Sequence, residues 1–326
     1  MTPLLENIKD VDFVASLRRR YGVSVLDTLL KDRTTGANII WADSEYEQLG
    51  VGYSPYDEIT AEKISFQRVI EPRVVKSIDQ QAWRTKEKAE VFTPSWLCKQ
   101  MVDCMDDAFF DEEPSGFVEN TPTGLTNERI AALGEKNRWK AYVDNRLLEI
   151  TCGEAPFVCS PYDATTGDFV PVDERIGFLD RKLRVVKHYT ETEDDWFKWA
   201  IRALQSSYAY EYQGDNLLIA RINVFNTFCD AMKDAQGRLP NEKEAKQIAR
   251  VISWNLWQMD GLRDCVPSEW DVPIESQPMS LFDLLDLDDE GEQQQDSAEN
   301  NVAQMCLIYD WRARTSQEFA SLKGQG

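Results

Sequence analysis

Three acidic residues follow apolar segments that have the composition of β-strands. Glu149 lies in LLEI, Glu211 lies in YAYEY, and Asp260 comes directly after SWNLWQM. In a parallel sheet the strands end at one edge, where ligands bind, so we expect these carboxylates to lie near one another. A carboxylate at that edge can bind a charged amine, the two hydroxyls of a ribose, or an adenine amino group.

Turns that contain glycine or amide side chains follow each of these acids. Gly153 stands in the turn TCGEAP after the first acid, where the lack of a side chain lets the backbone approach a ligand closely. Gln213 and Asn216 follow the second acid, and Gly261 follows the third. Each turn alone is common in proteins, and it is their order along the chain that indicates a nucleotide-like cofactor site.

Helical and strand-like segments alternate around these acids. Apolar side chains recur at helical spacing after Thr93 and Pro94, which predicts a helix with Thr93 as its N-cap and Pro94 as its first residue. The expected strands are residues 146–150, 208–212, 253–259 and 303–311. This alternation predicts an α/β fold with a parallel sheet covered by helices on both faces. We expect an N-terminal α+β extension, residues 1–89, before a cofactor-binding domain, residues 90–326.

Composition narrows the class of protein. The chain has 326 residues, 42% of them hydrophobic, which suits one large or two modest globular domains. No run approaches the roughly 18 apolar residues that span a bilayer, and the N-terminus lacks the pattern of a signal peptide, so we expect a cytoplasmic protein. Seven cysteines without a CxxC pair, and His188 as the only histidine, argue against structural zinc.

The charge is strongly acidic and uneven. The net charge is −21, and residues 283–299 hold eight acids and no base. Lys and Arg contacts dominate affinity for a DNA duplex, so action on DNA would require a local basic face or a partner subunit. The one clearly basic region, residues 73–88, is expected to form a solvated helix face. Residues 283–300 are expected to form a flexible acidic loop.

Four segments together resemble the cofactor motifs of amino-group DNA methyltransferases. They are EVFTP at 90–94, LLEITCGEAPF at 147–157, YEYQGDNLLIAR at 210–221 and WQMDGL at 257–262. Their order is similar to that of adenine-N6 modification subunits of restriction systems, and above all to the small bacterial family called "restriction endonuclease subunit M". The resemblance implies a Rossmann-like fold that binds S-adenosylmethionine, and a role in restriction-modification or phage defence.

The resemblance also assigns contacts to individual residues. Those implied to line the methionine end of S-adenosylmethionine are Phe92, Thr93 and Pro94. Those implied to hold its amino-acid part are Glu149, Thr151 and Gly153. Those implied to contact the nucleoside are Glu211 at the ribose hydroxyls, Asp260 at the adenine amino group and Leu262 beside the ring.

The chain departs from the family pattern in two places. The first motif lacks its second glycine, because Gly153 is followed by Glu154 and Ala155. The catalytic tetrapeptide Asn/Asp-Pro-Pro-Tyr/Phe, which accepts hydrogen bonds from the target amino group and stacks the flipped base, is absent, since no Pro-Pro pair occurs. Asp310 and Trp311, after the fourth expected strand, are the substitutes that we consider. We expect a partner subunit to supply DNA recognition and part of the sheet.

Two other functions remain open from the sequence. A non-catalytic relative would bind the cofactor or act as a scaffold, a defence accessory or an acidic DNA mimic, and the missing tetrapeptide would be its signature. A nuclease would hold Mg²⁺ with a cluster of carboxylates and a lysine. The residues considered for that cluster are Asp163, Asp168, Glu174, Asp180 and Lys182.

The segment 159–190 has no regular pattern at its start and reads as an irregular insertion between the first two motifs. It makes the distance from Glu149 to Glu211 far longer than the ~20 residues of a compact nucleotide-binding unit. We therefore expect a cap over the cofactor or target pocket. The side chains expected to face the site from it are Tyr162, Asp163, Arg175 and Arg184.

Overall fold

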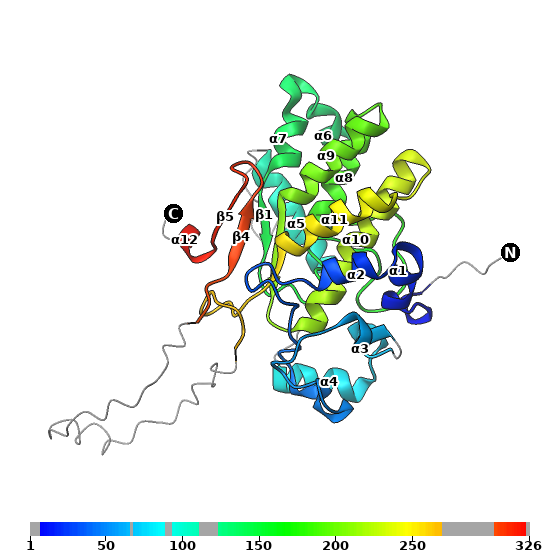
Figure 1. Ribbon diagram of the computed structural model, residues 1–326. Helices are drawn as coiled ribbons and strands as arrows, with labels where there is room; N and C mark the ends of the chain where they lie inside the picture. Colours follow the sequence, from blue (N-terminus) through cyan, green and yellow to red (C-terminus); the bar gives the residue numbers. More distant parts are fainter. Residues whose placement is uncertain (1–6, 66–67, 89–92, 111–122, 269–302, 324–326) are drawn as a thin grey trace, which may run out of the picture.

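The fold was analysed in a computed structural model, which describes residues 7–65, 68–88, 93–110, 123–268 and 303–323 (Figure 1). The α-helices are α1 (Phe13–Tyr21), α2 (Val23–Leu30), α3 (Ala61–Ser65), α4 (Ile78–Lys88), α5 (Ser95–Phe109), α6 (Asn127–Ala132), α7 (Arg138–Asp144), α8 (Phe178–Tyr189), α9 (Glu193–Gln205), α10 (Gly214–Gln236), α11 (Glu242–Asn255) and α12 (Ala320–Lys323). The strands are β1 (Leu147–Glu149), β2 (Ser207–Glu211), β3 (Leu256–Gln258), β4 (Leu307–Asp310) and β5 (Thr315–Glu318). None of the helices in these described ranges has the length and apolar character that crossing a bilayer requires.

A three-stranded parallel sheet with the order β1-β2-β3 forms the centre of the molecule. Each crossover contains two helices, α8 and α9 between the first two strands and α10 and α11 between the second two. Parallel strands need such helical crossovers, which cover the face of the sheet. The expectation of a mixed α/β fold with a parallel sheet flanked by helices is therefore confirmed. The expectation that helices cover both faces is wrong, because the hairpin of β4 and β5 packs on one of them.

The helices begin where the sequence supplies side chains that bond their first backbone N–H groups. Thr192 accepts from the N–H of Asp195 at the start of α9, and Asn241 and Glu244 form a reciprocal capping box at the start of α11. In α5 the first helical residue is Ser95, and Pro94 is the N-cap, so the helix begins close to the expected position. The insertion is irregular only in its first part, because residues from Phe178 onward form α8.

The two faces of the sheet are covered differently. Ala209 and Leu256 belong to the large hydrophobic core that the helices share. Tyr210 and Trp257 point to the other face, where they pack with Ile308 of β4 and with Phe319. Successive side chains of a strand point to opposite faces, which produces this division.

The fourth expected strand does not join the parallel sheet. β4 pairs with β5 in an antiparallel hairpin, in which Tyr309 lies opposite Ser316. The turn between the strands contains Arg314 with a positive φ of 58°, and the N–H of Arg314 donates to the carbonyl of Asp310 at 2.7 Å. The hairpin therefore forms a layer on the sheet face that the helices leave uncovered (Figure 1).

The N-terminal extension packs directly on the carboxyl ends of the strands. The backbone of Ile40 exchanges two hydrogen bonds of 2.9 Å with the side-chain amide of Gln258, at the end of β3. The N–H of Gly214 donates to the carbonyl of Trp41 at 3.0 Å, and a Cβ atom on Gly214 would lie 1.9 Å from the carbonyl oxygen of Ile40. Only glycine permits this close approach. The extension and the sheet thus share one hydrophobic core.

Candidate functional site

Two buried carboxylates lie at the carboxyl ends of neighbouring strands, as the sequence predicts. Glu149, at the end of β1, accepts hydrogen bonds from the N–H groups of Val158 at 3.0 Å and Phe157 at 3.3 Å. Glu211, at the end of β2, accepts from the N–H groups of Gly153 at 2.8 Å and Gln213 at 3.2 Å. The loop after β1 therefore folds over both strand ends and is held there by the two acids.

Burial makes these two carboxyl groups weak acids. Burial is the main reason that the pKa of Glu149 is raised to about 8, with a smaller contribution from the charge of Glu211, against the two backbone N–H groups that lower it. Burial likewise raises the pKa of Glu211 to about 7. Among the described residues, no Lys or Arg side chain is one of the main groups that shift the pKa of Glu149 or of Glu211. The site thus holds two acids that titrate near neutral pH and would gain from a bound cation.

The loop between the strand end and Phe157 has an unusual backbone. Thr151, Gly153 and Ala155 have positive φ angles of 45°, 54° and 63°. The left-handed region costs a β-branched residue such as Thr151 free energy that a glycine would not lose. Because every second residue of the loop has a positive φ, the N–H of Gly153 points toward Glu211, while the N–H of Cys152 donates to the carbonyl of Tyr210 at 2.9 Å.

Glu154, the charge that departs from the family pattern, anchors other parts of the chain. Its side chain is buried and accepts from the N–H of Arg73 at 2.6 Å and from the hydroxyl of Tyr162 at 2.7 Å. The side-chain amide of Asn223, on α10, donates to the same hydroxyl at 3.0 Å and to the carbonyl of Glu154 at 3.1 Å. The departure therefore ties the loop to the N-terminal extension and to α10.

A buried ion network beside Glu211 was not recognised in the sequence. Arg84, on α4, is fully buried and lies 3.0 Å from Asp215 and 2.6 Å from Glu45. Lys76 lies 3.2 Å from Asp215, to which the hydroxyl of Tyr46 also donates at 2.7 Å. Burial alone would raise the pKa of Asp215, but Lys76 and Arg84 hold it well below its usual range. The expectation that Arg84 and Lys76 lie on a solvated face is wrong.

This network fixes the start of α10. Arg84 also donates to the side-chain oxygen of Gln213 at 2.8 Å, and Gln213 is the residue whose N–H bonds Glu211. The signal in the sequence was Asp215, an acid in the first turn of a helix whose neighbours are nearly all apolar. A buried acid that is ionised needs compensating charge or hydrogen bonds, and here the basic segment 73–88 supplies the charge.

The third acid, Asp260, forms a turn. One of its oxygens accepts from the N–H groups of Leu262 at 2.8 Å and Arg263 at 3.3 Å, as in a common Asx turn. The side chain of Leu262 is 96% exposed and therefore has no packing partner in its described surroundings. The structure places Asp260 beyond the end of β3 but uses its carboxylate within its own turn.

The segment EVFTP, residues 90–94, is described only in part. Phe92 lies outside the described residues. Thr93 and Pro94 precede α5, the thiol of Cys98 donates to the carbonyl of Thr93 at 3.5 Å, and Ser95 donates to Asp163 at 2.6 Å. Burial, and secondarily the charge of Glu149, raises the pKa of the Cys98 thiol to about 12. Cys98, in the first turn of α5, therefore lies close enough to Glu149 for their charges to interact.

Asp310 and Trp311 do not lie with these residues. Asp310 is 3.3 Å from Arg146, which precedes β1, and the indole N–H of Trp311 donates to Asn255, which precedes β3, at 2.7 Å. These contacts are at the amino ends of the strands, whereas Glu149 lies at a carboxyl end. The expectation that Asp310 and Trp311 take the place of the catalytic tetrapeptide is therefore corrected, because the sheet separates them from the acids.

The carboxylates considered for a nuclease are dispersed. Asp180 is buried and accepts from the N–H groups of Ser160 at 2.9 Å and Gly177 at 3.0 Å, and Asp168 accepts from Asn7 at 2.8 Å. Lys182 donates to the carbonyls of Asn145 at 2.6 Å and Ser206 at 3.1 Å, at the amino ends of the first two strands. Among the described residues no group of His, Cys, Asp or Glu side chains could hold a metal ion. The proposed Mg²⁺ cluster is not formed.

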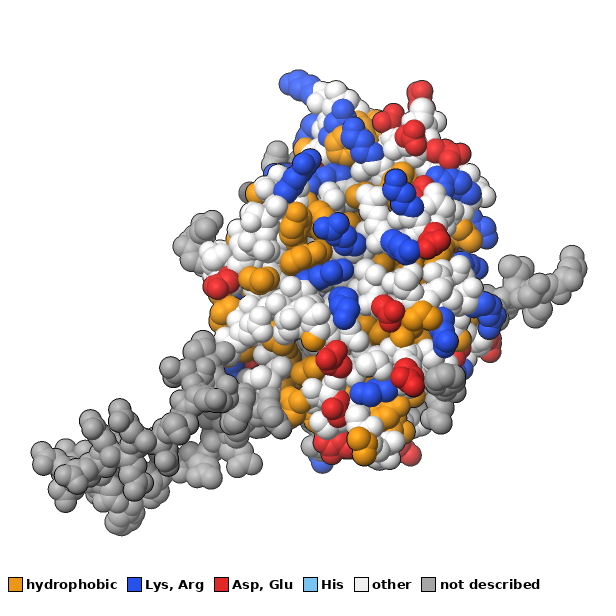
Figure 2. All heavy atoms as spheres, in the orientation of Figure 1, with side chains coloured by type: hydrophobic (Ala, Val, Ile, Leu, Met, Phe, Trp, Pro, Cys, Tyr) orange, Lys and Arg blue, Asp and Glu red, His pale blue; other side chains and the backbone are white. Residues whose placement is uncertain are grey.

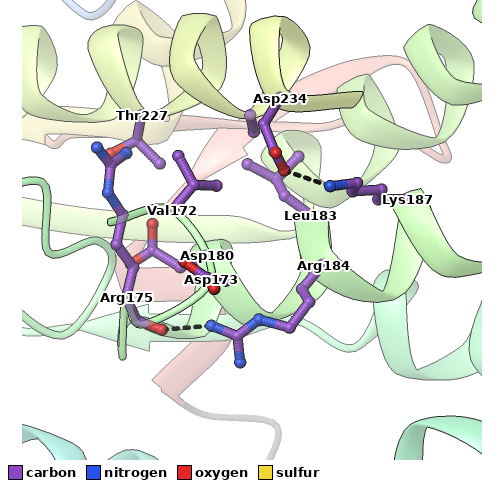
Figure 3. Close-up of a pocket in the computed structure, with 10 residues that line it drawn as sticks. Val172, Asp173, Arg175, Asp180, Leu183, Arg184, Lys187, Thr227 and Asp234 are labelled. Atoms are coloured by element: carbon purple, nitrogen blue, oxygen red, sulfur yellow. Dashed lines mark hydrogen bonds and ion pairs between the residues drawn. The ribbon is translucent and has the colours of Figure 1, made fainter. Parts of the chain in front are cut away.

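The insertion contributes to the site with one part only. Tyr162 and Asp163 contact Glu154 and Ser95, near the strand ends. Arg175 and Arg184 instead line a separate cavity of about 60 Å³ against α8 and α10 (Figure 3). Arg184 donates to the carbonyl of Arg175 at 2.8 Å there. The expectation that these two arginines face the cofactor or target pocket is therefore wrong for the site at Glu149 and Glu211.

Comparisons with protein-family models, with curated proteins and with solved structures gave no match to this chain.

Proposed function

We propose that this chain binds S-adenosylmethionine at the carboxyl edge of its sheet, as the cofactor-binding subunit of a DNA adenine-N6 methyltransferase. The observation that carries the proposal is the pair of buried carboxylates, Glu149 and Glu211, at adjacent ends of parallel strands. S-adenosylmethionine carries a sulfonium and an ammonium group, so it offers positive charge to a site with two acids, neither of which forms an ion pair with a described Lys or Arg side chain. In this proposal the three strands are part of a Rossmann-like methyltransferase sheet.

The residues present fit this cofactor in the region of its ribose and amino-acid part. The carboxylate of Glu211 accepts from the backbone N–H groups of Gly153, Gln213 and Tyr212, and one of its roughly four lone pairs is left for a ribose hydroxyl. The backbone at Gly153, held by Glu211, can approach the ligand without a side chain in between. At the adenine the fit requires a change, because Asp260 would have to exchange a bond within its turn and Leu262 would have to leave solvent.

The bound cofactor would supply a methyl group for direct transfer to an exocyclic amine. In such a transfer this chain would act by holding the donor in place, which can account for much of the rate enhancement. The group that accepts hydrogen bonds from the target amine would come from a partner subunit, since Asp310 and Trp311 lie at the other edge. The partner would also supply target recognition in a restriction-modification or defence system.

The position of Asp310 and Trp311 also favours a second candidate function. A chain that binds the cofactor without a target-amine acceptor of its own could be a non-catalytic scaffold in the same kind of system. Methyl transfer to DNA by this chain together with its partner would exclude that alternative. Cofactor binding without transfer in any combination would support it.

The test is calorimetric titration with S-adenosylmethionine of the wild-type protein and of Glu211→Gln. Wild type should bind, and Glu211→Gln should bind at least about tenfold more weakly, since it loses a charge-assisted bond to the ribose. Glu242→Gln, at the exposed start of α11, is the matched control and should bind as wild type does. Absence of binding to the folded wild-type protein would refute the proposal.

A further inference from the structure

The acidic charge of the chain is concentrated outside the residues that the structure describes. Those outside segments contain 17 Asp and Glu residues and no Lys or Arg. The described part therefore carries 36 Lys and Arg residues against 40 Asp and Glu residues. A net charge of −21 for the whole chain thus does not prevent the described part from presenting a basic surface.

Five arginines gather at the amino edge of the sheet, opposite the carboxylate site. The first two are Arg33 and Arg250, next to the residues that lead into β3. Arg33 donates to the hydroxyl of Ser253 at 2.8 Å, and its guanidinium lies 5.9 Å from the ring of Trp254. Burial lowers the pKa of Arg33, the positive charge of Arg250 lowers it further, and the charge of Asp32 opposes both.

The other three arginines surround the residues that lead into β1 and β2. Arg202 and Arg312 both form ion pairs with Asp144, and Arg146 lies 3.3 Å from Asp310. Three cations thus share two carboxylates. The side chains of Arg146 and Arg312 remain 47% and 54% exposed, so their free N–H groups are available to a ligand.

Half-buried aromatic rings connect the two groups of arginines into one surface. Tyr309 lies between Trp254, at 5.2 Å, and Trp311, at 4.6 Å, and it accepts a hydrogen bond of 3.3 Å at its carbonyl from Tyr208. We call this surface, defined by Arg33, Arg146, Arg202, Arg250 and Arg312, the amino-edge basic face. Figure 2 shows Lys and Arg side chains across the middle of the molecule over α9 and α11, with most acidic side chains toward its upper right and lower parts.

We propose that the amino-edge basic face binds the phosphate backbone of duplex DNA. Arginine suits phosphate because its guanidinium donates two parallel hydrogen bonds. The aromatic rings pack on one another and are half-buried, so they shape the surface and do not present a free platform for stacking single-stranded bases. The choice of DNA as ligand rests on the proposed function, whereas the basic face itself does not.

The location of this face implies that DNA binding and cofactor binding occur at opposite edges of the sheet. The face lies at the amino ends of the strands, and Glu149 and Glu211 lie at the carboxyl ends, so DNA held here would not bring a base to the cofactor by the same contacts. The face would instead hold the duplex without regard to sequence. This chain would then contact DNA itself, and a partner would direct the target base to the cofactor.

The test measures binding of a fluorescein-labelled duplex of about 20 base pairs by anisotropy across a series of salt concentrations. Wild type should bind at about 50 mM salt with a dissociation constant below about 100 µM, and log K should fall with log salt. The triple variant Arg33→Gln, Arg250→Gln, Arg312→Gln should bind at least about tenfold more weakly. Its salt slope should be shallower by about 2.7, or about 0.9 for each lost phosphate contact.

A second triple variant controls for the change in net charge. Lys9→Gln, Arg19→Gln and Arg20→Gln remove the same charge from the exposed N-terminal helices and should leave affinity within about twofold of wild type. Circular dichroism and thermal unfolding establish that each variant is folded. No binding by wild type at about 50 mM salt, or equal losses in the two triple variants, would overturn the proposal. Titration with S-adenosylmethionine reports on the carboxylate site separately, so each proposal can fail alone.

Discussion

Glu149 makes the stability of the folded protein depend on pH in a direction opposite to that of an ordinary surface acid. Its pKa is raised to about 8 in the folded protein, against about 4.3 in an unfolded chain. Between these values the folded state holds a proton that the unfolded state has lost. The free energy of unfolding therefore falls as pH rises through this window, and the contribution of Glu149 is constant below about pH 4 and above about pH 8.

The magnitude follows from one proton per molecule. A full difference of one bound proton changes the free energy of unfolding by about 1.4 kcal/mol per pH unit, so Glu149 lowers it by about 2.7 kcal/mol between pH 5 and pH 7. Glu149→Gln keeps the shape and an acceptor oxygen but does not titrate. The free energy of unfolding of Glu149→Gln, measured relative to that of wild type, should therefore rise by about that amount between pH 5 and pH 7.

The assay is urea unfolding of wild type and Glu149→Gln at pH 5, 6, 7 and 8. Glu242→Gln is the control, because Glu242 is exposed, Lys246 lowers its pKa, and it should show no trend in this range. The free energy of unfolding of Glu211→Gln relative to wild type should change with pH in the same direction as that of Glu149→Gln, since the pKa of Glu211 is raised to about 7. Parallel curves for wild type and Glu149→Gln would refute the reasoning, because they would mean that Glu149 is ionised in the folded protein throughout.

Three further substitutions test the contacts around the site. Gly214→Ala should lower the free energy of unfolding by about 3 kcal/mol, because its Cβ would overlap the carbonyl of Ile40, and chemical unfolding measures this. Arg84→Met should cost about 3–5 kcal/mol in the same assay, since Asp215 loses a buried partner. Burial lowers the pKa of Lys182 to about 7, so between about pH 7 and pH 10 the folded protein binds fewer protons than the unfolded chain, and its stability rises with pH. Lys182→Met should abolish this rise, which chemical unfolding across the same pH range measures.

Each of these substitutions has a matched control elsewhere in the chain. Gly237→Ala meets no atom within 4 Å and should cost only about 1 kcal/mol for its left-handed backbone. Arg238→Met removes the surface ion pairs with Glu193 and Glu244 and should cost no more than about 1 kcal/mol. Lys246→Met, at an exposed pair with Glu242, should leave the pH profile unchanged. If a substitution and its control have equal effects, the contact named for that substitution does not explain its effect.

The parallel sheet and its two acidic strand ends were predictable because local patterns determine them. Apolar segments with Glu149 and Glu211 at their ends, alternating with helical periodicity, leave few alternatives to a parallel sheet with these side chains at one edge. The same reasoning failed for the fourth strand. A segment such as LIYD has the same composition in a hairpin as in a parallel sheet, and the partner strand that decides between them follows a turn that has no strong sequence signal.

Long-range contacts of polar residues could not be read from the sequence. Arg84 has the local surroundings of a solvated helix, and only the buried Asp215, more than a hundred residues later, explains its position. Likewise Arg175 and Arg184 follow the loop that contains Gly153 but line a different cavity, which they share with residues of α10. Which charged residues become buried depends on how elements pack, and a single sequence does not record that.

The two-helix crossovers have a consequence for how the chain acquires its structure. Leu147 pairs with Ser207, and Ala209 pairs with Leu256, so each strand pairing closes a loop that contains two whole helices. Closing such a loop costs entropy before any sheet contact compensates for it. We therefore expect the helices to form before the strands align, and the carboxylate pair, which needs all of these elements, to be completed late in folding.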